Sequence, residues 1–380
     1  MDLPSYFTDF MAKIGPSDSE RAEYQKRHSE LREELHGDEG LSDIIVSTFL
    51  QGSYRRATLV RPKPGNHADV DVVVVTRLSQ EDTTPDQAIR KFIPFLEKHY
   101  AGKYELRGRS VGIRLSKVDL DLVVTSAPSE SQIGILQSEA VLSAETPEEV
   151  DDWRLVPSWV SLAHRVGEGS EALFKAAQEQ EWKLEPLYIP DREVQDWVPT
   201  HPLEQIRWTH EKNRLTDGYY IQVVKAIKWW KSISNVLPKY PKGYPLEHVI
   251  GVCCPDGITS VAEGVTITLE EIASRYAGYA IARQTPVLPD HGVPENNVLK
   301  RVSGEDFARF HQQVSQAAKV ARKARDAGSV DESATYWRNL FGDEFPQPPG
   351  DAGGDSRPDQ PKGGFTPRKE VGVIGGGRFA

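Results

Sequence analysis

Four consecutive valines, Val72 to Val75, are the feature that most restricts how this chain can fold. A run of β-branched residues favours a strand that is buried on both faces. The same segment opens with an Asp-x-Asp pair, Asp69 and Asp71. Residues two apart in a strand point to the same face. Both carboxylates are therefore expected to project together from the open end of a buried strand.

Helix and strand patterns alternate around this segment, which predicts a small mixed sheet backed by helices. Ser17 is a plausible N-cap for a helix, and Thr84 followed by Pro85 is typical of another helix start. The predicted elements are a helix over 17–35, strands over 44–50 and 69–78, a helix over 84–102, and strands over 104–116 and 117–128.

The second half of the chain has a different character. Residues from 128 to about 202 are rich in loop signals, and helical patterns return from Asn213. These predict a separate helical lobe, with helices over 213–235, 245–254, 259–283, 303–328 and 331–342. From Pro346 onward, six Pro and nine Gly fall within 35 residues. Such a segment cannot bury a core, which predicts a disordered tail.

Composition narrows the class of protein. The formal net charge of -10 argues against a chain-wide basic surface for nucleic acid. No apolar run approaches the roughly 20 residues that span a bilayer. The only cysteines, Cys253 and Cys254, are adjacent, so a disulfide between them is disfavoured and small buried side chains are expected. Low cysteine content and no recognisable signal peptide predict a cytoplasmic protein.

A second Asp-x-Asp pair, Asp119 and Asp121, lies on the next strongly apolar strand. Carboxylates this close repel each other unless a cation lies between them. Mg²⁺ takes oxygen ligands and removes that repulsion. If the two strands are neighbours, a third carboxylate joins Asp69 and Asp71. Three carboxylates can hold two Mg²⁺ ions about 4 Å apart, the arrangement used for in-line nucleotidyl transfer. Mn²⁺ is an alternative metal.

Gly52 and Ser53 precede the first acidic pair by about 16 residues. Glycine lets backbone approach a ligand closely. If a helix begins here, its N–H groups and the Ser53 hydroxyl can bind phosphates. Each element alone has an ordinary structural explanation, since Asp-x-Asp at a strand start is common turn chemistry. The combination of Gly-Ser, Asp-x-Asp and a later strand carboxylate is much more specific.

The segment QGSYRRATLVRPKPGNHADVDVVVV, residues 51–75, resembles the signature of the nucleotidyltransferase superfamily that includes DNA polymerase beta and oligoadenylate synthase. The closer resemblance, over most of the chain, is to clade D of the bacterial cGAS/DncV-like nucleotidyltransferases (CD-NTases) of CBASS anti-phage defence. It implies an α+β fold: a polymerase-beta-like core over 1–200, an oligoadenylate-synthase-like helical lobe over 201–345, and the tail over 346–380. The active site would lie in the cleft between the lobes, and the N-terminal helix would span both.

The resemblance also implies a reaction. Two Mg²⁺ ions would bind a nucleoside triphosphate, a ribose hydroxyl would attack its α-phosphate, and pyrophosphate would leave. Repetition and ring closure would convert ATP and GTP into a cyclic oligonucleotide, expected to be cyclic AMP-AMP-GMP, that activates an effector. We expect neither a nucleic acid nor a membrane to be required. An E1/E2-like conjugating enzyme is the expected partner of the tail, acting at Ala380.

Residue roles follow from the same resemblance. Asp69, Asp71 and Asp121 would be the catalytic metal ligands, because Asp121 fits the apolar-Asp-apolar-Val pattern of the family better than Asp119 does. Asp119 would lie next to these ligands without binding the metal directly. Gln51, Gly52 and Ser53 would contact the nucleotide phosphates. In the helical lobe, Lys228 would contact phosphate, with Lys225 as its rival, and Tyr244 would stack on the donor base.

Two further points concern the helical lobe. Relatives often carry Ser before the stacking aromatic, whereas this chain has Gly243, so one hydroxyl contact is lost. One or both of Trp229 and Trp230 are expected to be core residues of the lobe. Two alternative functions stay open: a nucleotidyltransferase with another acceptor, making linear oligoadenylate or modifying tRNA or a small molecule, and a silent nucleotide-binding module.

Overall fold

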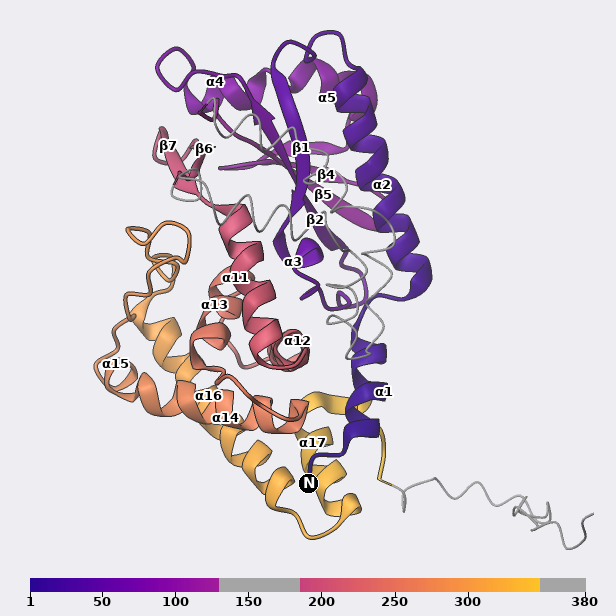
Figure 1. Ribbon diagram of the computed structural model, residues 1–380, viewed down its shortest axis with the longest axis vertical. Helices are drawn as coiled ribbons and strands as arrows, with labels where there is room; N and C mark the ends of the chain where they lie inside the picture. The colour runs from indigo at the N-terminus through magenta and orange to yellow at the C-terminus, as the bar shows by residue number, and fades with distance from the viewer. Residues whose placement is uncertain (130–184, 349–380) are drawn as a thin grey trace, which may run out of the picture.

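The computed structural model describes residues 1–129 and 185–348, which form a sheet-containing lobe and a helical lobe (Figure 1). Ala380 and all but the first three residues of the predicted tail lie outside this part of the chain. Within it, no helix is both long and apolar enough to cross a membrane.

The first lobe is built on a five-stranded mixed sheet in the order β1-β2-β5-β4-β3. Only the β2–β5 pair is parallel, and the other three pairs are antiparallel. Val72 to Val75 in β2 are completely buried, so the predicted central strand is confirmed. The strands are β1 (Ile45–Gln51), β2 (Ala68–Thr76), β3 (Tyr104–Leu106), β4 (Val111–Arg114) and β5 (Val118–Val124).

Helices cover one face of this sheet, where Val70, Val72 and Val74 pack into the larger apolar cluster of the lobe. The covering helices are α2 (Asp18–Gly37), α4 (Pro85–Arg90) and α5 (Ile93–Tyr100). Ser17 and Thr84 cap α2 and α4 as predicted, each in a capping box. On the opposite face, Val73 and Val75 pack near Leu187 and Leu203, which belong to later parts of the chain.

Two predicted elements of this lobe were wrong in detail, and one element was missed. The helix over 84–102 is broken after Arg90 into α4 and α5, because Pro94 has no N–H to donate to Arg90 and its ring would clash with that carbonyl. The strand over 104–116 is two strands, β3 and β4, joined by a turn. A hairpin of β6 (Leu187–Asp191) and β7 (Asp196–Thr200) was not predicted, because loop signals dominate its surroundings.

The second lobe is helical, as predicted. Its helices are α11 (Pro202–Leu215), α12 (Tyr219–Ile233), α13 (Tyr244–Cys253), α14 (Val261–Arg275), α15 (Ala277–Ile281), α16 (Gly304–Asp326), α17 (Val330–Phe341) and the 3-10 turn η2 (Gly342–Glu344). The helix predicted over 213–235 is the end of α11 followed by α12. The break is at Asp217 and Gly218, both with positive φ.

The predictions for individual side chains in this lobe are confirmed. Trp229 and Trp230 are each only 8% exposed and belong to the lobe core. Cys253 and Cys254 are buried free thiols.

The N-terminal residues are divided between the two lobes. Helix α1 (Pro4–Ile14) packs into the helical lobe, where Phe7 and Phe10 meet Trp337 and Phe341 of α17 at ring separations of 4.6 to 6.1 Å. Helix α2 starts four residues after α1 ends and belongs to the sheet lobe. The N-terminus therefore spans both lobes as two helices. The boundary placed at residues 200 and 201 stays a prediction, although β7 ends at Thr200 and α11 begins at Pro202.

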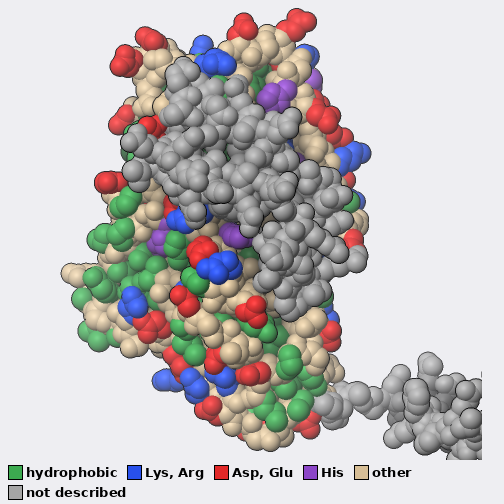
Figure 2. Space-filling view, viewed as in Figure 1, with side chains coloured by type: hydrophobic (Ala, Val, Ile, Leu, Met, Phe, Trp, Pro, Cys, Tyr) green, Lys and Arg blue, Asp and Glu red, His purple; other side chains and the backbone are tan. Residues whose placement is uncertain are grey.

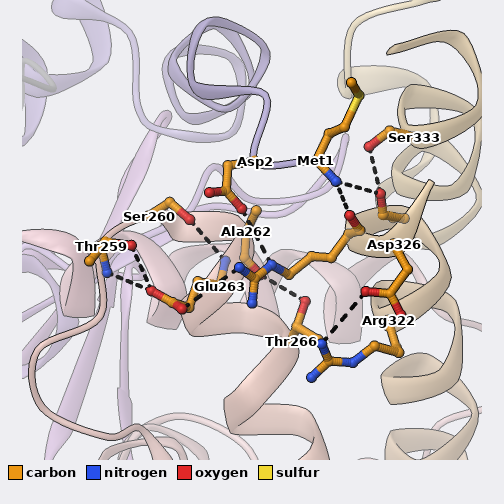
Figure 3. A network of polar contacts seen from close by, with 12 residues as sticks. Met1, Asp2, Thr259, Ser260, Ala262, Glu263, Thr266, Arg322, Asp326 and Ser333 are labelled. Carbon is orange, nitrogen blue, oxygen red and sulfur yellow. Dashed lines mark hydrogen bonds and ion pairs between the residues drawn. The ribbon is translucent and has the colours of Figure 1, made fainter. Parts of the chain in front are cut away.

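A polar network fixes the start of the chain on the helical lobe (Figure 3). The Met1 ammonium donates to the Ala324 carbonyl near the end of α16. Asp2 forms an ion pair with Arg325, which also lies 3.7 Å from Glu263 of α14. Glu263 in turn accepts a hydrogen bond from the Thr259 backbone. These contacts connect the residues before α1 to α14 and α16 of the helical lobe.

Candidate active site

The parallel register of β2 and β5 brings the acidic residues together. Asp69 lies opposite Asp119, and Asp71 lies opposite Asp121. Neighbouring strands are about 4.8 Å apart, and residues two apart share a face. All four carboxylates therefore occupy one face at one end of the sheet, the face that also carries Val73 and Val75. The two apolar strands are adjacent in the sheet, which was the condition set for the predicted carboxylate cluster.

The Gly-Ser segment lies directly beside Asp71. Gln51, at the end of β1, pairs in register with Asp71, and α3 (Gly52–Arg55) follows as a single helical turn. Gly52 has φ +75°, and a Cβ atom at this position would lie 1.9 Å from Asp71 Oδ2. Only glycine allows the helical turn and the carboxylate to lie so close. The structure thus places Gln51, Gly52 and Ser53 next to the acidic cluster.

Burial and mutual repulsion raise the pKa values of the cluster. Burial, followed by the charges of Asp121 and Asp69, raises the pKa of Asp71 to about 7. Burial also raises the pKa values of Asp69 and Asp121, although the nearby Arg107 guanidinium opposes the rise. Raised pKa values show that the nearby positive charges do not balance these neighbouring carboxylates. A hard divalent cation would supply the missing positive charge, and it prefers oxygen ligands of this kind.

As the side chains stand, no three His, Cys, Asp or Glu residues in the described parts of the chain converge as a metal site. Asp121 and Asp119 both have other partners: Arg107 Nη1 donates to Asp121 Oδ1 at 2.5 Å, and His67 Nδ1 lies 2.9 Å from Asp119 Oδ1. The acidic cluster fits a divalent metal in ligand type, register and charge. For the carboxylates to bind a common metal ion, Asp121 would have to give up its contact with Arg107 and bind the metal instead.

Glu247 of α13 is a buried acid that sequence reasoning missed. Its carboxylate accepts from Arg56 Nη2 at 3.1 Å, from Thr58 Oγ1 at 2.9 Å and from Lys228 Nζ at 2.7 Å. Glu247 is 3% exposed and Arg56 is 6% exposed. The signal was present in the sequence, because Glu247 is the one carboxylate in the mostly apolar segment PLEHVIGVCC.

The Glu247 contacts join the two lobes next to the acidic cluster. Arg56 directly follows the α3 turn, whereas Lys228 and Glu247 come from α12 and α13. Burial alone would raise the pKa of Glu247, but Lys228 and Arg56 outweigh it and lower that pKa to about 2. Asp71 also contributes to the electrostatic environment of both Arg56 and Lys228.

The two rival lysines differ in location. Lys228 lies within the charge network that reaches Asp71, as expected for a residue near the nucleotide phosphates. Lys225 is buried beside Gly15, and burial together with Arg21 and Lys228 lowers its pKa to about 8. The geometry therefore favours Lys228, and its contact with phosphate stays a prediction.

Tyr244 begins α13 immediately after Gly243, whose φ of +60° favours glycine at that position. The Arg56 guanidinium lies 5.2 Å from the Tyr244 ring centroid, and the Tyr244 hydroxyl lies 3.2 Å from His248 Nδ1. His248 continues into a column of stacked rings with His291 and Trp208, with 3.9 Å between successive centroids. Sequence reasoning missed this column, which holds Tyr244 in place near Arg56.

With the fold and the site described, comparison with known proteins identifies the family. Residues 1–134 match the model of the Second Messenger Oligonucleotide or Dinucleotide Synthetase (SMODS) domain. The chain is 46% identical to a cyclic AMP-AMP-GMP synthase of Enterobacter hormaechei subsp. hoffmannii (strain UCI 50), over 100% of both chains. This chain belongs to the CD-NTases. It is a nucleotidyltransferase, and the resemblance inferred from residues 51–75 is confirmed.

Solved CD-NTase structures have the same fold. CdnG of Bradyrhizobium diazoefficiens in complex with GTP aligns with a TM-score of 0.64 at 12% identity, over 90% of this chain and 96% of that one. DncV of Vibrio cholerae with a linear intermediate aligns with a TM-score of 0.61 at 13% identity, over 91% and 97%. The predicted α+β, polymerase-beta-like architecture is confirmed. Enzymes of this family generally use a divalent metal.

Replacing Gly52 with Ala should abolish most nucleotidyl transfer by this CD-NTase, because the new Cβ would displace the Asp71 carboxylate. A displacement of about 1 Å in an active site costs about 100-fold in rate. Pyrophosphate release from ATP and GTP measures the effect, and circular dichroism checks the fold. Gly65→Ala is the matched control, since Gly65 has φ +84° but nothing within 4 Å of its Cβ position. Equal losses in both variants would show that backbone strain, rather than the Asp71 contact, is responsible.

Glu247 should make the stability of this CD-NTase depend on acidic pH. Its pKa is lower in the folded state, about 2, than the ordinary value of 4.5. Its stabilising contribution is therefore complete above pH 4.5 and declines as the pH falls toward 2. Between pH 6 and pH 3.5, the wild type should lose about 1 kcal/mol that Glu247→Gln does not lose. Urea unfolding at several pH values measures this difference. A constant gap between the two proteins would contradict the expectation.

Proposed function

We propose that this enzyme makes cyclic AMP-AMP-GMP from ATP and GTP, and that the product activates an effector of anti-phage (CBASS) defence. The observation that carries the proposal is the β2–β5 register, which sets Asp69, Asp71 and Asp121 on one face beside Gly52 and Ser53. The proposed product comes from the full-length relative at 46% identity, which is named for that product.

Asp69, Asp71 and Asp121 are proposed to hold two Mg²⁺ ions, with Mn²⁺ as an alternative. The bound cations would stabilise charge on the triphosphate and favour ionisation of the attacking hydroxyl. The side chains of the protein hold the metal ligands in place and handle the proton of the attacking hydroxyl. The buried valines of β2 hold Asp69 and Asp71 rigidly, and the Asp121 carboxylate would help accept the proton of the acceptor ribose hydroxyl.

Phosphate binding is proposed for Gln51, Gly52, Ser53 and Lys228. The α3 turn, which carries Ser53, begins at Gly52 directly beside Asp71. Lys228 reaches the same region from the helical lobe, where Glu247 fixes its ammonium group at 2.7 Å. Groups held in place before the substrate arrives need no reorganisation during the reaction. Glu247 would act as a positioning residue through Lys228 and Arg56.

Tyr244 is proposed to stack on the donor base. Its ring is partly exposed, and its orientation is fixed by His248 and by Arg56. Aromatic rings stack on any base, so this contact would hold the nucleotide without choosing between adenine and guanine.

The enzyme is proposed to act without a nucleic acid activator, in the cytoplasm where ATP and GTP are available. The net charge of -10 supports action without a nucleic acid activator. On the face in Figure 2, the visible basic side chains are interspersed with acidic ones rather than gathered into one area. A surface of mixed sign does not concentrate a polyanion.

Incubating the protein with ATP, GTP and Mg²⁺ should yield a phosphatase-resistant product whose mass corresponds to two AMP units and one GMP unit in a ring. Asp71→Asn and Asp121→Asn should reduce product formation by at least about 100-fold. Asp119→Asn removes the same charge from the same strand as Asp121 and should retain most of the activity. A linear product would favour an oligoadenylate-type function, and a fully active Asp121→Asn variant would overturn the assignment of the third metal ligand.

We further propose that Ala380 is the site at which an E1/E2-like enzyme conjugates the synthase to other molecules. The Gly-rich sequence before Ala380 supports this, since residues without side chains allow a chain terminus to enter a narrow site. Coexpression with such an enzyme should produce higher-mass adducts on denaturing gels, and deletion of the last three residues should remove them while leaving synthesis by the purified enzyme unchanged. Adducts that persist after the deletion would place conjugation elsewhere.

A further inference from the structure

Arg107 occupies the acidic cluster, although it belongs to none of the sequence motifs. It follows β3, and its Nη1 donates to Asp121 Oδ1 at 2.5 Å. The Arg107 side chain is 33% exposed and that of Asp121 is 19% exposed, so this ion pair is substantially shielded from water. Arg56, which also lies near Asp71, is engaged by Glu247.

The fold provides space for the Arg107 guanidinium. Gly112 of β4 lies opposite Asp121 in the β4–β5 register. A Cβ atom at Gly112 would lie 2.5 Å from Arg107 Cζ and 2.6 Å from Nε and Nη2. The guanidinium therefore lies directly on the Gly112 backbone, in space that any side chain would fill. The absence of a side chain at Gly112 is what allows Arg107 to reach Asp121.

The backbone that carries Arg107 is anchored by the hairpin of β6 and β7. Arg192 donates its backbone N–H to the Gly108 carbonyl at 2.8 Å and its Nη1 to the Arg107 carbonyl at 3.3 Å. Next to it, Arg109 forms an ion pair at 2.5 Å with Asp191, which is 1% exposed. Any displacement of Arg107 from Asp121 is thus confined to its side chain, since its main chain is held.

We propose that Arg107 is a built-in counter-cation of the metal site: it neutralises Asp121 in the metal-free enzyme and competes with the divalent cation there. This inference rests on the metal site of the proposed function. Four carboxylates in register repel one another, and one fixed positive charge among them lowers that repulsion. The same charge repels an incoming divalent cation and occupies one Asp121 oxygen. Arg107 is therefore a positioning residue that weakens metal binding while it stabilises the metal-free cluster.

The test is Mn²⁺ binding by the purified full-length protein without nucleotide, at pH 8 and low ionic strength, with free Mn²⁺ quantified by electron paramagnetic resonance. Arg107→Gln should bind Mn²⁺ about tenfold more tightly than the wild type, because a repelling charge at close range is removed. Arg107→Lys should stay close to the wild type. Gly112→Ala should give a gain in the same direction with Arg107 still present, since the added Cβ displaces the guanidinium.

Two controls separate this inference from its alternatives. Arg309→Gln removes an exposed charge from α16 in the helical lobe and should leave Mn²⁺ affinity unchanged. Asp71→Asn should abolish binding in the wild type and in the Arg107→Gln background. Unchanged or weaker binding by Arg107→Gln, with wild-type binding that depends on Asp71, would overturn the role of Arg107 alone. Absence of Asp71-dependent binding in every variant would overturn the metal site itself, and the counter-cation role with it.

Discussion

The parallel pairing of β2 with β5 is the constraint on which the rest of the site depends. It is the only parallel pair in the five-stranded sheet, and it places Asp71 opposite Asp121. Apolar side chains on the other face bury both strands, so a shift of register would expose valines as well as misplace carboxylates. The free energy that holds the carboxylates together against their repulsion therefore comes from burial of the strands that carry them.

The charge network around Glu247 connects this sheet to the helical lobe. Burying ions is costly unless each is paired and hydrogen-bonded. Here the cations Arg56 and Lys228 are both paired with Glu247, and Asp71 lies close enough to favour their charged forms. The network contributes more to the orientation of these side chains than to the free energy of unfolding. It connects Arg56, directly after the α3 turn of one lobe, to Lys228 and Glu247 of the other.

Several features could be predicted because they depend on local chemistry. The capping boxes at Ser17 and Thr84, the buried strand at Val72 to Val75 and the one-turn helix after Gln51 all follow from residues within a few positions of each other. The break at Pro94 was also local and could have been recognised. The β6–β7 hairpin was not recognisable, since its strands are short and partly exposed and are supported by residues far away in sequence.

The sequence by itself determined that two strands each carry an Asp-x-Asp pair, that Gly-Ser stands before the first, and that a second helical lobe follows. Those facts, with the resemblance over most of the chain, pointed to the family that the 46% identical relative confirms. Only the tertiary structure determined which charged side chains contact each other. Glu247 with Arg56 is a contact across 191 residues, and Arg107 with Asp121 requires Gly112 on the intervening strand. Such contacts depend on register and lobe packing, which bring together residues that no local pattern in the chain connects.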